Sequence, residues 1–282
     1  QKLMQVLGFP FDSGRLDTSH HPFSGGTPED LRITTRYDER DFMSSLMAVL
    51  HETGHALYEY GLPREWRNQP VGCSLGMAIH ESQSLLIEMQ VCRSEEFIKF
   101  VLPHIVEAFG SSVGKLSPHD LGRLLRDVKP GFIRVEADEV TYPFHIILRY
   151  KFEKLLMNGE LRVQDLPSLW REEMQKMLGI EPKDDRDGCL QDIHWYGGDF
   201  GYFPTYTLGA LTAAQMFEAA VQENSNILPS LEEGDFCPLY NWLRPKVHSL
   251  GHLLPASLLV EQATGAPLSV DAFKRHLQVR YL

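Results

Sequence analysis

The chain has 282 residues, of which 43% are hydrophobic and 23% are charged. These proportions are ordinary for a soluble globular protein with a sizeable core. The 27 basic and 38 acidic side chains give a formal net charge of -11. This excess of acid argues against nucleic acid or an anionic membrane as the main partner, because both require a basic surface.

The four cysteines are scattered along the chain and form no C-x-x-C pair: Cys73, Cys92, Cys189 and Cys237. This pattern predicts reduced thiols and a cytoplasmic location rather than a disulfide framework. No apolar run approaches the about 18 residues that a membrane-spanning helix needs, and the chain does not open on a signal-peptide pattern.

The first residue is Gln1 rather than Met, and Lys2–Leu7 has the pattern of a helix already under way, so we expect the chain to be a fragment. The stretch from Gly8 to Thr35 is rich in Gly, Pro, Asp and Ser, which indicates loops and short strands. Within it, Leu31–Tyr37 is β-branched and alternating, and it predicts a strand.

The next segment predicts an amphipathic helix that begins at an Asp41 cap and stops at Gly61, ahead of Pro63. On it, His51-Glu52-Thr53-Gly54-His55 forms an H-E-x-x-H motif. The two histidines lie one turn apart on one face, so both imidazoles can reach one cation, and Glu52 can take a proton from water on it. Gly54 costs a helix about 1 kcal/mol relative to Ala, which suggests that something approaches its backbone closely.

The rest of the chain predicts mainly helices, with short Gly- and Pro-containing joints between them. The expected helices are Ser74–Phe100, His119–Lys129, Tyr142–Asn158, Val163–Leu178, Tyr206–Glu223, Pro238–Leu243 and a stretch from Lys246 to the end. There is no internal repeat or obvious linker, so we expect a single, mainly α domain over residues 1–282.

Two histidines leave a catalytic zinc ion one short of the three protein ligands that it usually has. A third His at the metzincin offset would fall at position 61, which is a glycine, so that class is excluded. Spacing leaves the remaining ligand open among Glu59, Glu65, His80, Glu81 and Glu88.

Six motifs together carry a resemblance over nearly the whole chain. Their patterns are H-P-F, D-x-R-x-T, H-E-x-x-H, H-E-S-Q, I-R-x-x-A-D-E-x-T-Y and G-x-x-Q-D-x-H-W, in that order. They stand at His21–Phe23, Asp30–Thr34, His51–His55, His80–Gln83, Ile133–Tyr142 and Gly188–Trp195. With these motifs, the chain resembles the carboxypeptidase Taq family of metallocarboxypeptidases.

The resemblance implies that Glu81 is the third metal ligand, which makes the site a gluzincin site. It also implies a neurolysin-like helical fold, split by a deep groove, with a small antiparallel sheet beside the H-E-x-x-H helix. A homodimer is implied as well. Members of the family are longer, with an N-terminal helical region that walls the groove and is missing here.

Arg134 lies in an acidic stretch and has two interpretations. It can hold helices together in a salt-bridge network, or its planar fork can bind the terminal carboxylate of a peptide. The resemblance favours the second. Arg32, Asp192 and His194 carry the same ambiguity, and the resemblance suggests that they line or close one end of the groove.

The aromatic segment after residue 198 resembles the segment from which related enzymes place a phenol near the metal. We expect Tyr206 to donate to the oxyanion of the reaction and Tyr202 to line the substrate site. His248 and His252 also lie one turn apart, but no Glu stands at the matching offset, so we interpret them as packing or groove-wall residues.

The sequence therefore predicts a metal-dependent carboxypeptidase that acts on peptides with a free C-terminus. His51, His55 and Glu81 would hold one divalent ion, zinc by preference, although cobalt and manganese suit the same ligands. Glu52 would be the general base, and Arg134 would bind the substrate carboxylate. Two alternatives stay open: an endo-acting oligopeptidase of the same fold, and an inactive, metal-stabilised scaffold.

Overall fold

The computed structural model describes residues 1–20, 22–110 and 113–282, so His21 of the H-P-F motif lies outside the described residues. The chain divides into two compact units. Unit 1 contains residues 1–125 and 209–282, and unit 2 contains residues 126–208. A single catalytic domain over residues 1–282 stays a prediction.

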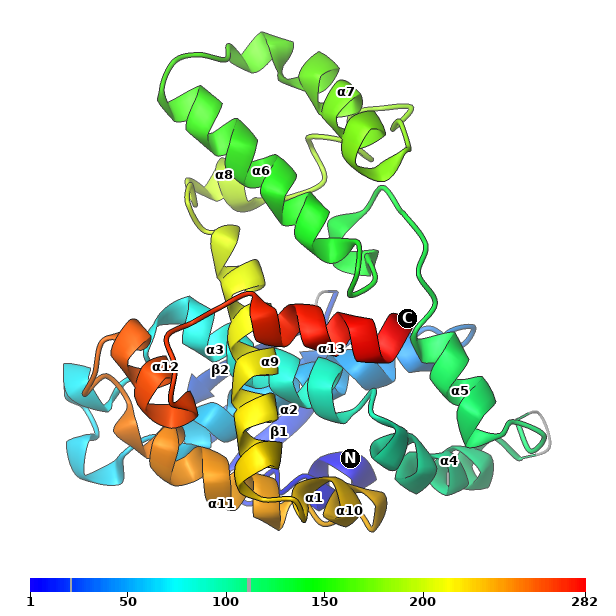
Figure 1. Cartoon of the computed structure of the whole chain (residues 1–282), viewed down its shortest axis with the longest axis vertical. Helices are drawn as coiled ribbons and strands as arrows, with labels where there is room; N and C mark the ends of the chain where they lie inside the picture. Colours follow the sequence, from blue (N-terminus) through cyan, green and yellow to red (C-terminus); the bar gives the residue numbers. More distant parts are fainter. Residues whose placement is uncertain (21, 111–112) are drawn as a thin grey trace. The chain divides into compact units, whose positions relative to one another are not determined.

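Unit 1 is built from both ends of the chain, which Figure 1 colours blue to green and yellow to red. Its first part contains α1 (Lys2–Val6), β1 (Gly14–Thr18), β2 (Phe23–Thr27), β3 (Asp30–Thr35), α2 (Phe42–Gly61), η1 (Arg64–Trp66), η2 (Pro70–Gly72), α3 (Gly76–Leu85), η3 (Leu86–Val91), α4 (Glu95–Phe109) and α5 (Pro118–Leu125). Its second part contains most of α9 (Pro204–Glu223), and α10 (Ile227–Glu232), α11 (Cys237–Lys246), η7 (His248–Leu250), α12 (Ala256–Thr264) and α13 (Asp271–Tyr281).

Unit 2 contains η5 (Arg134–Glu136), α6 (Tyr142–Met157), η6 (Val163–Asp165), α7 (Leu166–Leu178), α8 (His194–Gly197) and the start of α9. Its core lies between α6 and α7, where Phe152 stacks on Trp170 with ring centroids 5.4 Å apart. The prediction of a mainly helical protein with a small sheet is confirmed.

The sheet is mixed, with strand order β1-β3-β2. The expectation of antiparallel pairing is right for β2 with β3 and wrong for β1 with β3, which run parallel. The strands alternate in direction along the chain, and the third inserts between the other two, so it runs parallel to the first. Leu31 and Ile33 of β3 pack with Val49 and Ala56 of α2, which anchors the sheet on the motif helix.

Helix α2 has the predicted limits. The Asp41 side chain accepts a hydrogen bond from the Ser44 amide, and the helix ends at Gly61. The expected long helix from Ser74 to Phe100 is wrong, because it breaks after a π-helical turn, η3. A new helix, α4, then starts at a Ser94 cap that accepts from the Phe97 amide. The stretch after Lys246 is also not continuous, because Pro255 and Gly265 separate its helices.

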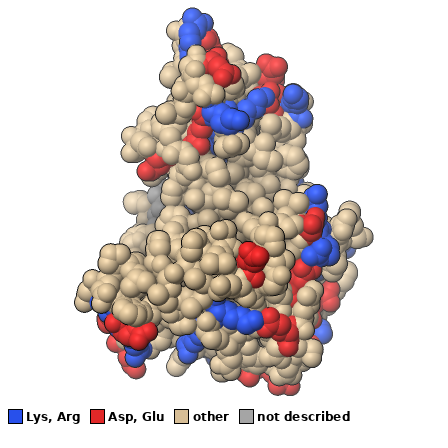
Figure 2. Space-filling view, turned by 60° about the vertical axis from the view of Figure 1, so that its left-hand side comes forward, with Lys and Arg blue, Asp and Glu red and all other residues tan. Residues whose placement is uncertain are grey.

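The surface mixes charges of both signs. On the face shown in Figure 2, lysines and arginines lie beside aspartates and glutamates in small groups. Exposed pairs such as Lys99–Glu232 and Arg275–Glu218, at 2.9 and 2.7 Å, illustrate this mixing. None of the described helices combines the length and the hydrophobicity that a membrane-spanning segment requires.

Candidate metal centre

Helices α2 and α3 approach each other closely at the H-E-x-x-H motif, and Gly54 permits this. A Cβ atom at Gly54 would lie 2.7 Å from the Gln83 carbonyl oxygen and 2.7 Å from the Ser84 Cα atom. Gly209 of α9 gives α3 similar room on another side, because a Cβ there would lie 2.8 Å from Cγ of Glu81. The glycine inside the motif helix thus makes room for the backbone of the helix that carries Glu81.

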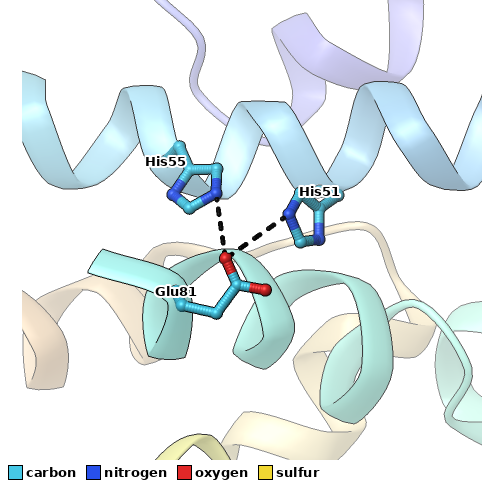
Figure 3. Close-up of side chains that lie close together, drawn as sticks. All are labelled: His51, His55 and Glu81. Carbon is cyan, nitrogen blue, oxygen red and sulfur yellow. Dashed lines mark ion pairs between the residues drawn. The ribbon is translucent and has the colours of Figure 1, made fainter. Parts of the chain in front are cut away.

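This approach brings three side chains together. Oε2 of Glu81 lies 3.9 Å from Nε2 of His51 and 3.5 Å from Nε2 of His55. Figure 3 shows both imidazoles projecting from α2 toward the carboxylate on α3. The three ligand atoms all lie within 4.8 Å of one another, and the side chains are largely buried. Two imidazole nitrogens and one carboxylate oxygen at such separations suit a tetrahedral cation that keeps one open position.

The outward-facing nitrogens of both histidines are also engaged. Nδ1 of His51 lies 2.9 Å from Oε2 of Glu88, whose other oxygen accepts from Arg93 at 2.9 Å. Nδ1 of His55 lies 2.6 Å from Nδ1 of His80. Contacts of this kind behind the ligands orient the imidazoles and fix their tautomers.

The structure places all five candidates for the third ligand. Glu81 is the one that joins the two histidines. Glu59, His80 and Glu88 stand behind the ligands: His80 and Glu88 touch them, and Glu59 contacts His80. Glu65 is exposed on η1. The ligand set His51, His55 and Glu81 is therefore geometrically consistent.

The electrostatics of this cluster favour a bound cation. Burial alone would lower the pKa of His51, but Glu81 and Glu88 raise it to about 10. Burial raises the pKa of Glu52 to about 7. Glu81 and Glu88 also raise this pKa, whereas His51 lowers it. Burial lowers the pKa of His55 to about 4. Three largely buried carboxylates in one place favour a nearby positive charge, and a divalent ion would supply it.

Unit 2 contains a second cluster of buried charges, centred on Asp192. Nε and Nη2 of Arg134 donate to Oδ1 of Asp192 at 2.9 and 2.7 Å, and Nη1 donates to the Tyr142 hydroxyl at 2.7 Å. Nε of Arg149 donates to Oδ2 of Asp192 at 2.6 Å. Burial would raise the pKa of Asp192, but the two arginines hold it below its usual value. The ion pair expected of a structural role for Arg134 is therefore present.

The predicted aromatic residues surround this second cluster. The Tyr206 ring lies 4.9 Å from the Arg134 guanidinium carbon, and its hydroxyl is 3.1 Å from Nε2 of His194. Tyr202 packs against His194 and Tyr206, with ring centroids 5.4 and 5.6 Å away. Four predicted residues are thus gathered around one arginine, and the roles given to them stay predictions.

Two further predicted site residues lie in unit 1. Arg32 is exposed on β3 and pairs with Asp30 at 2.6 Å. His248 is only 2% exposed, packs against Gly61 and has its Nε2 3.0 Å from Oε1 of Gln83. Whether His248 is a packing or a groove-wall residue stays a prediction.

Sequence reasoning missed Arg149 and His145, both fully buried on α6. A buried arginine among apolar residues of a helix is a recognisable signal, since it requires a charged partner. Neither ring nitrogen of His145 has a hydrogen-bond partner among the described residues. Burial, together with Arg149 and Arg134, lowers the pKa of His145 to about 4.

With the geometry established, comparisons identify the class of protein. A family model for carboxypeptidase Taq (M32) metallopeptidases matches residues 1–281, and the chain belongs to this family. Carboxypeptidase 1 of Bacillus subtilis is 42% identical over 99% of this chain and 56% of its own length. Thermostable carboxypeptidase 1 of Thermus thermophilus is 44% identical over 99% of this chain and 55% of its own length.

Solved structures agree. Metallocarboxypeptidase 1 of Trypanosoma cruzi superimposes with a TM-score of 0.96 at 43% identity, over 99% of this chain and 59% of that one. An M32 carboxypeptidase of Deinococcus radiodurans gives a TM-score of 0.97 at 35% identity, over 99% of this chain and 57% of that one. The chain thus spans little more than half the length of these relatives. Membership of a metallopeptidase family and the His-His-Glu cluster together imply a divalent metal ion.

Proposed function

We propose that the chain is the metal-binding part of a carboxypeptidase that hydrolyses the C-terminal peptide bond of peptides. The observation that carries the proposal is the convergence of His51, His55 and Glu81 on one point, with Glu52 next to His51 on the same helix. The names of the relatives, carboxypeptidases in each case, support the choice of reaction.

In this proposal the ion, when bound, supplies Lewis-acid chemistry and lowers the pKa of a coordinated water to about 7. Glu52 takes the proton from the attacking water and delivers it to the leaving amine nitrogen. General acid–base catalysis of this kind contributes about 10²–10⁴-fold. Burial of Glu52 at 8% exposure keeps bulk water from competing for its carboxylate.

Arg134 is proposed to bind the free carboxylate of the substrate, with Arg149 as a second source of positive charge. The pair shares a single carboxylate, that of Asp192, so the trio carries two positive charges and one negative charge. A peptide carboxylate would neutralise the remaining charge. Three hydrogen bonds of the Arg134 side chain use three of the five N–H donors of its guanidinium group.

The other predicted residues take supporting parts in this proposal. Asp192 orients the arginines, and His194 holds the Tyr206 hydroxyl, which is proposed to donate to the oxyanion. Tyr202 is proposed to line the substrate site, as is Arg32. His248 is proposed to act through packing, because it is buried.

Zinc is the proposed ion, since two imidazoles and one carboxylate are typical ligands of catalytic zinc, and cobalt or manganese would suit them too. A homodimer and a cytoplasmic location are proposed as well. The four cysteines are unpaired in the structure, in agreement with a reducing compartment.

Hydrolysis of matched peptides tests the function. The zinc-loaded chain is incubated with an N-blocked dipeptide that has a free C-terminus and with the same peptide amidated at its C-terminus. Glu52→Gln is the control that keeps the volume and removes the base. A carboxypeptidase cleaves the free peptide and spares the amide, and Glu52→Gln abolishes that cleavage while zinc stays bound.

Each other outcome contradicts the proposal in a distinct way. Equal cleavage of both peptides indicates an endo-acting oligopeptidase. Zinc bound without cleavage of either peptide indicates an inactive scaffold. Cleavage that survives Glu52→Gln overturns the role of Glu52.

A further inference from the structure

His80 lies between His55 and Glu59 in a continuous hydrogen-bonded chain. Its Nδ1 is 2.6 Å from Nδ1 of His55, and its Nε2 is 2.8 Å from Oε1 of Glu59. The side chain of His80 is only 14% exposed. His55 and Glu59 are one turn apart on α2, and His80 reaches them from α3.

Adjacent residues of α3 therefore contact opposite edges of the same imidazole. Oε2 of Glu81 lies 3.5 Å from Nε2 of His55, and the ring of His80 meets Nδ1 of His55. The pair His80-Glu81 thus supplies a metal ligand and a support for a second ligand from two consecutive positions. Gly54 lets α3 come close enough for both contacts.

The positions of the protons follow from this geometry. A nitrogen that binds a metal carries no proton, so a neutral His55 that binds through Nε2 carries its proton on Nδ1. That proton can only be donated to Nδ1 of His80, which must then be an acceptor. Neutral His80 consequently carries its proton on Nε2 and donates it to the carboxylate of Glu59. Each hydrogen bond in this series then has one defined donor and one defined acceptor.

We propose that His80 is a positioning residue that fixes the tautomer and ring orientation of His55, with Glu59 as its anchor. The inference rests on the proposed metal site. Support of this kind is worth about 10–100-fold in metal affinity in proteins generally. The support of His51 is different, because Glu88 accepts from it directly.

Three substitutions distinguish the contributions of the individual hydrogen bonds between His55, His80 and Glu59. His80→Phe keeps a ring but removes the acceptor for His55. His80→Asn keeps an acceptor oxygen near the position of Nδ1 and loses the link to Glu59. Glu59→Gln keeps an oxygen that can accept from Nε2 of His80. None of the three removes a metal ligand.

Two measurements are made on each variant of the whole chain. Zinc affinity is measured by competition with a chelator, and the tautomer of His55 is read from imidazole ¹⁵N chemical shifts of the metal-free protein. We expect His80→Phe to weaken zinc binding by about 10–100-fold and to deplete the Nδ1–H tautomer of His55. His80→Asn should restore most of both, and Glu59→Gln should have the smallest effect.

Wild-type affinity in His80→Phe overturns the proposal, even if the tautomer changes. Equal losses in His80→Phe and His80→Asn with an unchanged His55 tautomer also overturn it, since they indicate a structural role only. Should the wild-type chain bind no zinc, the proposed metal function fails. The ¹⁵N shifts still decide whether His80 sets the tautomer of His55 in that case.

Discussion

Nδ1 of His51 lies 2.9 Å from the carboxylate of Glu88, while Nε2 of the same ring points to Glu81. Glu88 is two helical turns beyond Glu81, at the π-helical turn η3, and Arg93 holds its other oxygen at 2.9 Å. The α3–η3 segment therefore supplies one carboxylate to the proposed ion and another to a histidine that binds it.

We predict that Glu88→Gln weakens zinc binding by about 10–100-fold. The amide oxygen can still accept a hydrogen bond from His51, but the negative charge of the carboxylate is lost. The amide nitrogen is itself a donor, so it cannot accept the hydrogen bond from Arg93. Chelator competition measures the effect. Glu65→Gln is the matched control, because Glu65 is exposed on η1. Equal affinities in the two variants would contradict the prediction.

Gly54→Ala should reduce the free energy of unfolding although Ala favours helix by about 1 kcal/mol. The added Cβ would lie 2.7 Å from backbone atoms of Gln83 and Ser84. Because α3 is packed on its other sides, its backbone can move only slightly to relieve these contacts. Overpacking of this kind costs about 1–3 kcal/mol. Urea unfolding measures it, with Gly131→Ala as control, since no atom lies within 4 Å of a Cβ there. A stabilised Gly54→Ala would disprove the tight α2–α3 contact.

The Asp192 cluster predicts an asymmetry between two substitutions. Asp192→Asn leaves Arg134 and Arg149 buried without their shared carboxylate, so we expect a loss of about 3–5 kcal/mol. Arg149→Met should reduce the free energy of unfolding by less, because Asp192 keeps its ion pair with Arg134. Arg162→Met, in an exposed pair with Asp165, should cost only about 0–1 kcal/mol. Urea unfolding at pH 7 measures all three, and a larger loss for Arg149→Met would refute the shared-carboxylate account.

The stability of the chain should fall in mild acid because of His145. Its pKa is about 4 in the folded chain, owing to burial and to Arg149 and Arg134, with Asp192 and Asp138 opposing them. The unfolded value is about 6.5, so the unfolded chain binds more protons between these values, and stability decreases as pH drops from about 6.5 to 4.

His145→Asn should reduce the slope of unfolding free energy against pH in this range by up to about 1.4 kcal/mol per pH unit. Urea unfolding at several pH values between 7 and 4 measures the slope. Leu148→Ala, a buried neighbour that does not titrate, should lower stability and keep the wild-type slope. An unaltered slope in His145→Asn would rule out this contribution.

Local signals made part of this fold predictable. The Asp41 cap, the Gly61 stop and the spacing of His51 and His55 all act within one helix, so the sequence alone indicates them. The break before α4 is also local, because the Ser94 cap and the two acidic residues after it interrupt a long apolar pattern. The parallel pairing of β1 depends on where β3 inserts, which strand patterns do not encode.

The contacts that complete the site join residues far apart in the chain. Spacing could not choose Glu81 over His80, and the choice needed the family motif. The structure explains the ambiguity, because both residues contact His55 from different sides. Likewise, Asp192 reaches Arg134 and Arg149 across 58 and 43 positions, a partnership that no periodicity reveals.

The location of the bound ion tests the central claim most directly. Crystals of the zinc-loaded chain, measured at the zinc absorption edge, give an anomalous difference map. The account predicts one strong peak per chain at about 2.0–2.2 Å from Nε2 of His51, Nε2 of His55 and a carboxylate oxygen of Glu81. A peak on His80 and Glu59 instead, or none near His51 and His55, would contradict it.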